Sequence, residues 1–93
     1  MIQSFADRDT RAFFEKGVCH RSWRAFAKVA LRKLDMLDAA IELKDLRSPP
    51  GNRLEALQGN RAGQHSIRIN DHWRICFRWG AKGPEDVEIV DYH

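Results

Sequence analysis

The sequence has little of several features that define large classes of protein. Its 93 residues include two cysteines, Cys19 and Cys76, which stand far apart and form no C-x-x-C pattern. We therefore expect no disulfide framework, and a reducing compartment fits this cysteine usage. No apolar run approaches the ~20 residues of a membrane helix, and the opening residues lack the basic and apolar regions of a signal peptide. These absences predict a soluble, cytoplasmic protein without a membrane partner.

A strong charge of one sign is also missing, because the net charge is only +3. The second half of the chain nevertheless carries arginine and no lysine between residues 53 and 78. Arginine presents a planar, permanently charged fork that matches phosphate oxygens, whereas lysine is a flexible point charge. A solvated charged face is the other interpretation of such a segment. The candidate phosphate-binding residues are Arg53, Arg61, Arg68, Arg74 and Arg78.

The length fits one domain over residues 1–93, and the apolar share of 43% fits a globular chain with one core. We expect a short strand over residues 1–5 and a helix from an N-cap at Asp7 to Lys16, ended by Gly17. A longer helix is expected over about residues 22–41. Its apolar face repeats every three or four residues and comprises Trp23, Phe26, Ala27, Ala30, Leu34, Leu37 and Ile41, with Arg24, Lys28, Arg32, Lys33 and Asp35 on the other faces.

The second half reads as strands. A proline- and glycine-containing loop over residues 46–52 excludes a helix there, and residues 53–57 form a short strand or an ordered loop. Polar and apolar residues alternate over 65–69 and 73–79, on either side of a turn at 70–72. A loop over 80–86 leads to a final strand at 87–90.

Alternation assigns the side chains of these strands to two faces. The face expected to meet the helices holds Ile67, Ile69, Trp73, Ile75, Phe77, Trp79, Val87 and Ile89. The open face holds Ser66, Arg68, Asn70, Arg74, Cys76, Arg78, Glu88, Val90 and Tyr92. The predicted fold class is α+β, in the order β-α-α-β-β-β, with both helices on one face of a small antiparallel sheet.

The chain ends in an acid, a phenol and an imidazole: Asp91, Tyr92 and His93. All three can take part in proton transfer, although a terminus is more often a solvated end. An imidazole titrates near pH 6.5, so His93 suits either proton role near neutrality. Tyr92 could orient or stack on a base, and Asp91 could orient His93 or an arginine. Arg74 is the candidate for stabilising charge on a phosphate, with Arg68 and Arg78 as neighbours.

Four stretches carry a resemblance to a known family: residues 49–57 (PPGNRLEAL), 59–70 (GNRAGQHSIRIN), 73–77 (WRICF) and 87–93 (VEIVDYH). Together they resemble the HigB group of the RelE/ParE toxin superfamily, and within it the GraT-like toxins. The resemblance implies a RelE-like fold and a toxin of a type II toxin–antitoxin module. It further implies cleavage of messenger RNA in the decoding site of the ribosome, without a metal or other cofactor. The implied partner is a HigA-type antitoxin with a helix-turn-helix fold.

Residue by residue, the resemblance assigns a catalytic role to Arg74 and to the tail Asp91, Tyr92 and His93. Relatives also have a histidine and a lysine where this chain has Glu55 and Gln58. The missing cation could come from Arg53, Arg61 or Arg68, and the sequence does not choose among them.

Two other functions fit the same sequence. One is a non-catalytic module that binds RNA or the ribosome and inhibits translation by occupancy. The other is a gyrase poison of the ParE type, against which the Asp-Tyr-His tail argues. The spacing of His65, His72 and His93 matches no recognised metal motif, so no metal site is expected.

Overall fold

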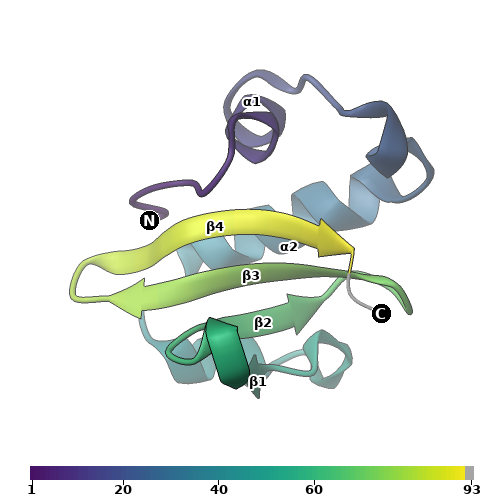
Figure 1. The fold of residues 1–93 in the computed structure, drawn as a ribbon. Helices are drawn as coiled ribbons and strands as arrows, with labels where there is room; N and C mark the ends of the chain where they lie inside the picture. The colour runs from purple at the N-terminus through teal and green to yellow at the C-terminus, as the bar shows by residue number, and fades with distance from the viewer. Residues whose placement is uncertain (92–93) are drawn as a thin grey trace.

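The computed structural model describes residues 1–91, and the last two residues lie outside the described part. Two α-helices precede a four-stranded antiparallel sheet with the strand order β1-β2-β3-β4 (Figure 1). The α+β class and the position of the helices before the strands are as predicted. The helices and strands are α1 (Arg8–Lys16), α2 (Ala27–Ala39), β1 (Glu55–Ala56), β2 (His65–Arg68), β3 (Trp73–Gly80) and β4 (Gly83–Asp91), and the 3₁₀ turns are η1 (Arg21–Phe26), η2 (Leu43–Arg47), η3 (Pro50–Asn52) and η4 (Gly59–Arg61).

The two ends of α1 confirm the predicted caps. Asp7 accepts hydrogen bonds from the backbone N–H of Thr10 at 2.6 Å and from its hydroxyl at 3.1 Å. Gly17 ends the helix with φ at 71°, in the left-handed region that glycine enters without steric cost. A side-chain acceptor at one end and a glycine at the other therefore fix the length of this helix.

The long helix predicted over 22–41 is divided in the structure. Phe26 leaves helical geometry (φ −125°, ψ 20°) between η1 and α2, and its ring packs 5.2 Å from that of Trp73. The backbone turns out of α2 at Ala40, where ψ is 135°. Ile41 consequently lies beyond the helix and is 86% exposed, so its predicted place in the core is wrong.

The predicted first strand over residues 1–5 is reduced to a single parallel bridge between Phe5 and Val87. Two hydrogen bonds flank this bridge, from Ala6 N to Val87 O and from Val87 N to Ser4 O. The first residues also contact α2, because Ile2 N donates to a carboxylate oxygen of Asp38 at 2.8 Å. This segment therefore lines β4 without forming a strand.

The predicted loop over 80–86 is much shorter in the structure. β3 ends at Gly80 and β4 begins at Gly83, so the connection is a tight turn. Pro84 lies inside β4, opposite Trp79, and its carbonyl accepts a hydrogen bond from Gln3 N. Proline has no N–H to donate to a neighbouring strand. At this position its carbonyl nevertheless joins β4 to the N-terminal segment. The predicted loop over 46–52 contains no α-helix, but it holds the end of η2 and the whole of the 3₁₀ turn η3.

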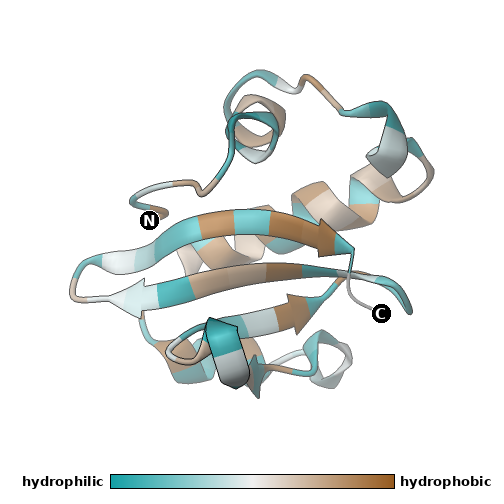
Figure 2. Cartoon of the chain, viewed as in Figure 1, coloured by the Kyte–Doolittle hydropathy of each residue, from teal (hydrophilic) through white to brown (hydrophobic). Residues whose placement is uncertain are grey.

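The core lies between α2 and the back of the sheet. Figure 1 shows α2 crossing behind the strands, and Figure 2 shows apolar and polar residues alternating along β4. The residues predicted to face the helices do so, and six of them are buried: Ile67, Ile69, Ile75, Phe77, Val87 and Ile89. Trp73 and Trp79 are half-buried against this core. The predicted phase of the strands is confirmed.

The front face is less open than the alternation predicts. Ser66 and Cys76 are neighbours across β2 and β3, and both are fully buried. Figure 1 shows η4 in front of the sheet on this side. From η4, the Arg61 guanidinium donates to Glu88 on β4 at 2.7 Å and to Gln64 at 2.9 Å. Burial raises the pKa of the Cys76 thiol above its usual value, so the thiol stays protonated at neutral pH.

Candidate functional site

A polar hollow of about 270 Å³ lies where β2 ends and β3 begins. Three arginines line it together with the two residues at the start of the β2–β3 turn: Arg53, Arg68, Asn70, Asp71 and Arg74. The hollow therefore brings together three of the five arginines that the sequence singles out. An anionic group placed here would meet several guanidinium donors at once.

Arg74 is the most enclosed of the three arginines, since its side chain is 12% exposed, that of Arg68 is 31% exposed, and Arg53 is exposed. One terminal nitrogen donates to the backbone carbonyl of Arg53 at 2.8 Å, and the other lies 3.7 Å from a carboxylate oxygen of Glu55. The strand register places Arg68 directly across from Arg74. Two like charges face each other across neighbouring strands, which is unfavourable unless anions offset them.

The turn between β2 and β3 supplies one such anion. Asp71 forms an ion pair with Arg68 while remaining 83% exposed. The Asn70 side chain accepts hydrogen bonds from His72 N and Trp73 N, both at 2.9 Å. This pattern closes a tight turn and fixes the start of β3, including the adjacent Arg74. Because Asp71 is solvated, a phosphate could displace it from Arg68 at modest cost.

Arg53 follows η3 and has φ at 46° and ψ at 54°. A residue with a side chain rarely adopts this left-handed conformation, which costs of order 1 kcal/mol. Its N–H donates to Pro50 O at 3.1 Å, and its own carbonyl accepts the hydrogen bond from Arg74. The strained backbone thus presents both a guanidinium and a carbonyl to the hollow.

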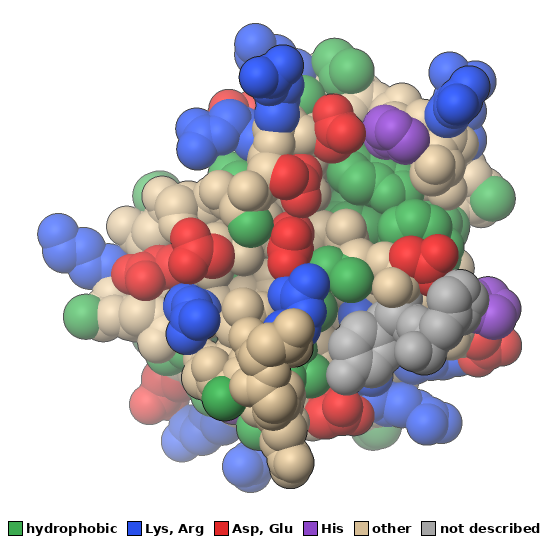
Figure 3. Space-filling model, in the orientation of Figure 1, with side chains coloured by type: hydrophobic (Ala, Val, Ile, Leu, Met, Phe, Trp, Pro, Cys, Tyr) green, Lys and Arg blue, Asp and Glu red, His purple; other side chains and the backbone are tan. Residues whose placement is uncertain are grey.

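The other two predicted arginines lie elsewhere on the sheet. The Arg61 guanidinium is paired with Glu88, as described, and the Nε of Arg78 lies 3.7 Å from a carboxylate oxygen of Asp86. Arg78 is four residues further along β3 than Arg74, or about 13 Å in an extended strand. Figure 3 shows acidic and basic side chains interleaved over this side of the molecule. A substrate-binding role for Arg61 and Arg78 stays a prediction, outside the hollow.

The described chain ends at Asp91, which closes β4 opposite Trp73. Alternation places its side chain on the face of Trp73, whereas Arg74, paired with Val90, points to the other face. Tyr92 and His93, the other predicted tail residues, lie outside the described residues. Their roles, and the roles of Asp91 and Arg74, stay predictions.

One charged residue near the site was not predicted. Lys33 of α2 is only 9% exposed, and its ammonium donates to the side-chain oxygen of Asn52 at 2.5 Å. Burial lowers the pKa of Lys33 below 10.5, and the charges of Arg32 and Arg68 lower it further. The sequence held a signal, because Lys33 lies three residues after Ala30 and four before Leu37 on the apolar face. Its predicted place on the solvated side of the helix is wrong.

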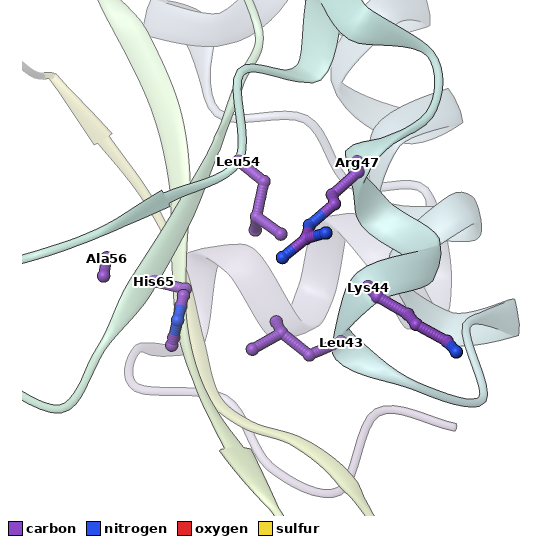
Figure 4. Close-up of a pocket in the computed structure, with 6 residues that line it drawn as sticks. All are labelled: Leu43, Lys44, Arg47, Leu54, Ala56 and His65. Carbon is purple, nitrogen blue, oxygen red and sulfur yellow. The ribbon is translucent and has the colours of Figure 1, made fainter.

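A second hollow, of about 410 Å³, lies between η2 and the edge of the sheet (Figure 4). Leu43, Arg47 and Leu54 point into the same space, while Lys44 runs away from it. Among residues 1–91, its wall contains neither Asp91 nor any of the five arginines predicted for the site, so the smaller hollow is the candidate site. Within residues 1–91, no cluster of three or more His, Cys, Asp or Glu side chains has the arrangement of a metal site. No helix in this part of the chain is long and apolar enough to cross a bilayer.

Comparison with known protein families matches residues 3–93 to the RelE-like toxins of type II toxin–antitoxin system HigB. The chain belongs to this family. The toxin is 45% identical over 80 residues to Toxin HigB-1 of Vibrio cholerae, covering 85% of this chain and 84% of that relative. It is 30% identical over 93 residues to Endoribonuclease HigB of Proteus vulgaris, covering the whole of both chains.

A solved structure supports the fold of the toxin independently. The YoeB/ParE toxin from Agrobacterium tumefaciens matches with a TM-score of 0.53, covering 99% of this chain and 96% of that one. At 18% sequence identity this likeness shows the fold alone. The family and the α+β fold that the sequence resemblance implies are thus confirmed.

Proposed function

We propose that this toxin is a ribosome-dependent endoribonuclease that cleaves messenger RNA without a metal ion and so inhibits translation. The observation that carries the proposal is the hollow in which Arg53, Arg68 and Arg74 converge. A relative aligned along the whole chain bears the name Endoribonuclease HigB, which supports the same chemistry. The proposed partners are a HigA-type helix-turn-helix antitoxin, the ribosomal decoding site and the messenger RNA bound there.

The chemistry has three requirements. A base must take the proton of the 2′-hydroxyl, a cation must stabilise the phosphorane, and an acid must protonate the leaving 5′-oxygen. In our proposal Arg74 stabilises the phosphorane, because its guanidinium is enclosed and held by a backbone carbonyl. In the same proposal Arg53 and Arg68 bind the phosphate from the sides of the hollow and take the place of the missing family cation.

The proton transfers are assigned to the tail. His93 carries the imidazole that can gain and lose a proton near neutral pH. Tyr92 would orient or stack on a base, and Asp91 would orient His93. These assignments rest on the family resemblance and on side-chain chemistry.

Mapping of messenger 5′ ends after a short pulse of toxin expression tests the proposal. We compare the wild type with Arg74→Ala, with a chain ending at Asp91, and with Arg24→Ala as an exposed-arginine control on η1. New 5′ ends should appear with the wild type and Arg24→Ala and be absent with the other two. Growth arrest without new ends would favour inhibition by occupancy. Cleavage by a folded Arg74→Ala variant would refute the assignment of the site.

A further inference from the structure

Asn52 is a fully buried polar residue at the end of η3, behind the arginine hollow. Its amide nitrogen donates to the carbonyls of Leu46 and Ser48, at 3.1 and 3.3 Å, and contacts the sulfur of Met36. Its oxygen accepts a hydrogen bond from the Lys33 ammonium. A single side chain thus joins α2, η2 and the loop that follows η2.

The residue after this buried amide is Arg53, whose carbonyl holds the Arg74 guanidinium at 2.8 Å. The carbonyl that positions the proposed catalytic arginine therefore belongs to the residue directly after Asn52, the partner of Lys33. The left-handed backbone of Arg53 persists only if its surroundings impose it. The contacts of Asn52 supply that restraint from the N-terminal side.

Holding the Asn52 amide with a buried lysine costs folding free energy. Its ammonium is nearly buried and lies close enough to Arg68 for that charge to lower its pKa. An apolar side chain at this position of α2 would avoid both costs, since buried charges contribute little to stability unless well compensated. A functional reason for keeping the buried charge would be that its hydrogen bond to Asn52 fixes the geometry of the hollow.

We propose that Lys33 and Asn52 are positioning residues that hold the Arg53 carbonyl, and through it Arg74, in the geometry that stabilises the transition state. This inference rests on the proposed function. Small displacements of a positioned group can lower a rate about a hundredfold. Because Arg74 acts on charge that develops during the reaction, loss of its position should lower kcat and leave KM nearly unchanged.

Steady-state cleavage of messenger RNA on purified ribosomes tests this inference with Lys33→Met, which keeps the aliphatic stem and removes the ammonium. Lys28→Met, an exposed lysine on the same helix, is the matched control. We expect kcat to fall about 10- to 100-fold in Lys33→Met, with KM within about threefold of the wild type. Lys28→Met should cleave at the wild-type rate. A Lys33→Met rate within twofold of the wild type would overturn the inference.

A double-mutant cycle separates positioning from a general structural effect. In the Arg74→Lys background, Lys33→Met should reduce cleavage by less than about threefold, because the group that it positions is already gone. Multiplicative effects of the two substitutions would overturn the inference. If Lys33→Met does not fold, Lys33→Gln replaces it, because the shorter neutral side chain keeps a donor but removes the charge.

A readout that does not depend on cleavage keeps this inference distinct from the proposed function. The side-chain Nε–H resonance of Arg74, assigned by its loss in Arg74→Lys, should shift in Lys33→Met and stay in place in Lys28→Met. An unmoved resonance in folded Lys33→Met would refute the positioning role. A wild type that cleaves no RNA, together with a shifted resonance, would refute the proposed function and leave the positioning of Arg74 supported.

Discussion

Replacing Asn52 with alanine should destabilise the fold far more than an ordinary polar substitution. The change leaves the Lys33 ammonium and the carbonyls of Leu46 and Ser48 without the hydrogen bonds that Asn52 provides. A hydrogen bond to a charged group contributes about 1.5–3 kcal/mol and a neutral one about 1 kcal/mol. Together these terms predict a loss of about 4 kcal/mol, a large part of the ~5–15 kcal/mol that stabilises a typical domain.

Urea unfolding at 25 °C, followed by tryptophan fluorescence, measures this loss directly. Since 1 kcal/mol corresponds to roughly 4–8 °C in a domain of this size, Tm should fall by roughly 20 °C. The control is Asn60→Ala, the same substitution at an exposed position in η4, which should change stability by less than about 0.5 kcal/mol. A loss below about 1 kcal/mol in Asn52→Ala, with an unchanged urea dependence, would refute the reasoning that this buried amide joins α2 to the loop.

Three further outcomes follow from buried groups. Thr10→Val should cost about 2 kcal/mol in urea unfolding, because the hydroxyl donates to the α1 N-cap and accepts from Ile89 N; a loss below about 0.5 kcal/mol would contradict this. In the native protein iodoacetamide should modify Cys19, which is partly exposed, well before the buried Cys76; equal labelling rates, read by mass spectrometry, would contradict the burial. Lys33 has a folded-state pKa below the 10.5 of the unfolded chain, so between these two values the unfolded state binds more protons and stability rises with pH. The stability of the wild type relative to Lys33→Met should therefore increase as pH approaches 10.5, and a decrease would contradict the sign of the shift.

The two faces of the sheet could be predicted because strand alternation is local. Ile75 and Phe77 point to the helices as a simple two-residue period requires, and Arg68 and Arg74 share the other face for the same reason. Their pairing in one hollow follows once the short turn at Asn70 sets the register of β2 and β3. This part of the site was within reach of sequence reasoning.

The rest of the site depends on contacts between distant segments. Cys76 is buried on the front face, in front of which η4 lies, and no local sequence pattern predicts that cover. The carbonyl of Arg53, a left-handed residue directly after η3, meets Arg74 across 21 residues of sequence. A charged residue such as Lys33 is expected to be solvated unless a buried partner is known. That partner, Asn52, is 19 residues away in sequence, so local patterns do not predict the burial of Lys33.

The loop before β4 illustrates a different difficulty. Gly83 and Pro84 are typical turn residues, and their composition predicts a loop. In the structure both residues belong to β4. The N-terminal segment lies along this part of β4, where a neighbouring strand would otherwise pair, and Gln3 N donates a hydrogen bond to Pro84 O. Turn composition alone therefore predicts a loop here, and the contact between the N-terminal segment and β4 explains why a strand forms instead.

The bridge between Phe5 and Val87 also bears on how this sheet avoids joining with others. Unpaired strand edges are templates for aggregation. The N-terminal segment occupies one edge of the sheet by bonding to β4, and at the opposite edge β1 is only two residues long. A chain that lacked its first five residues would expose the edge of β4 between Pro84 and Val87, and self-association through that edge would then compete with folding.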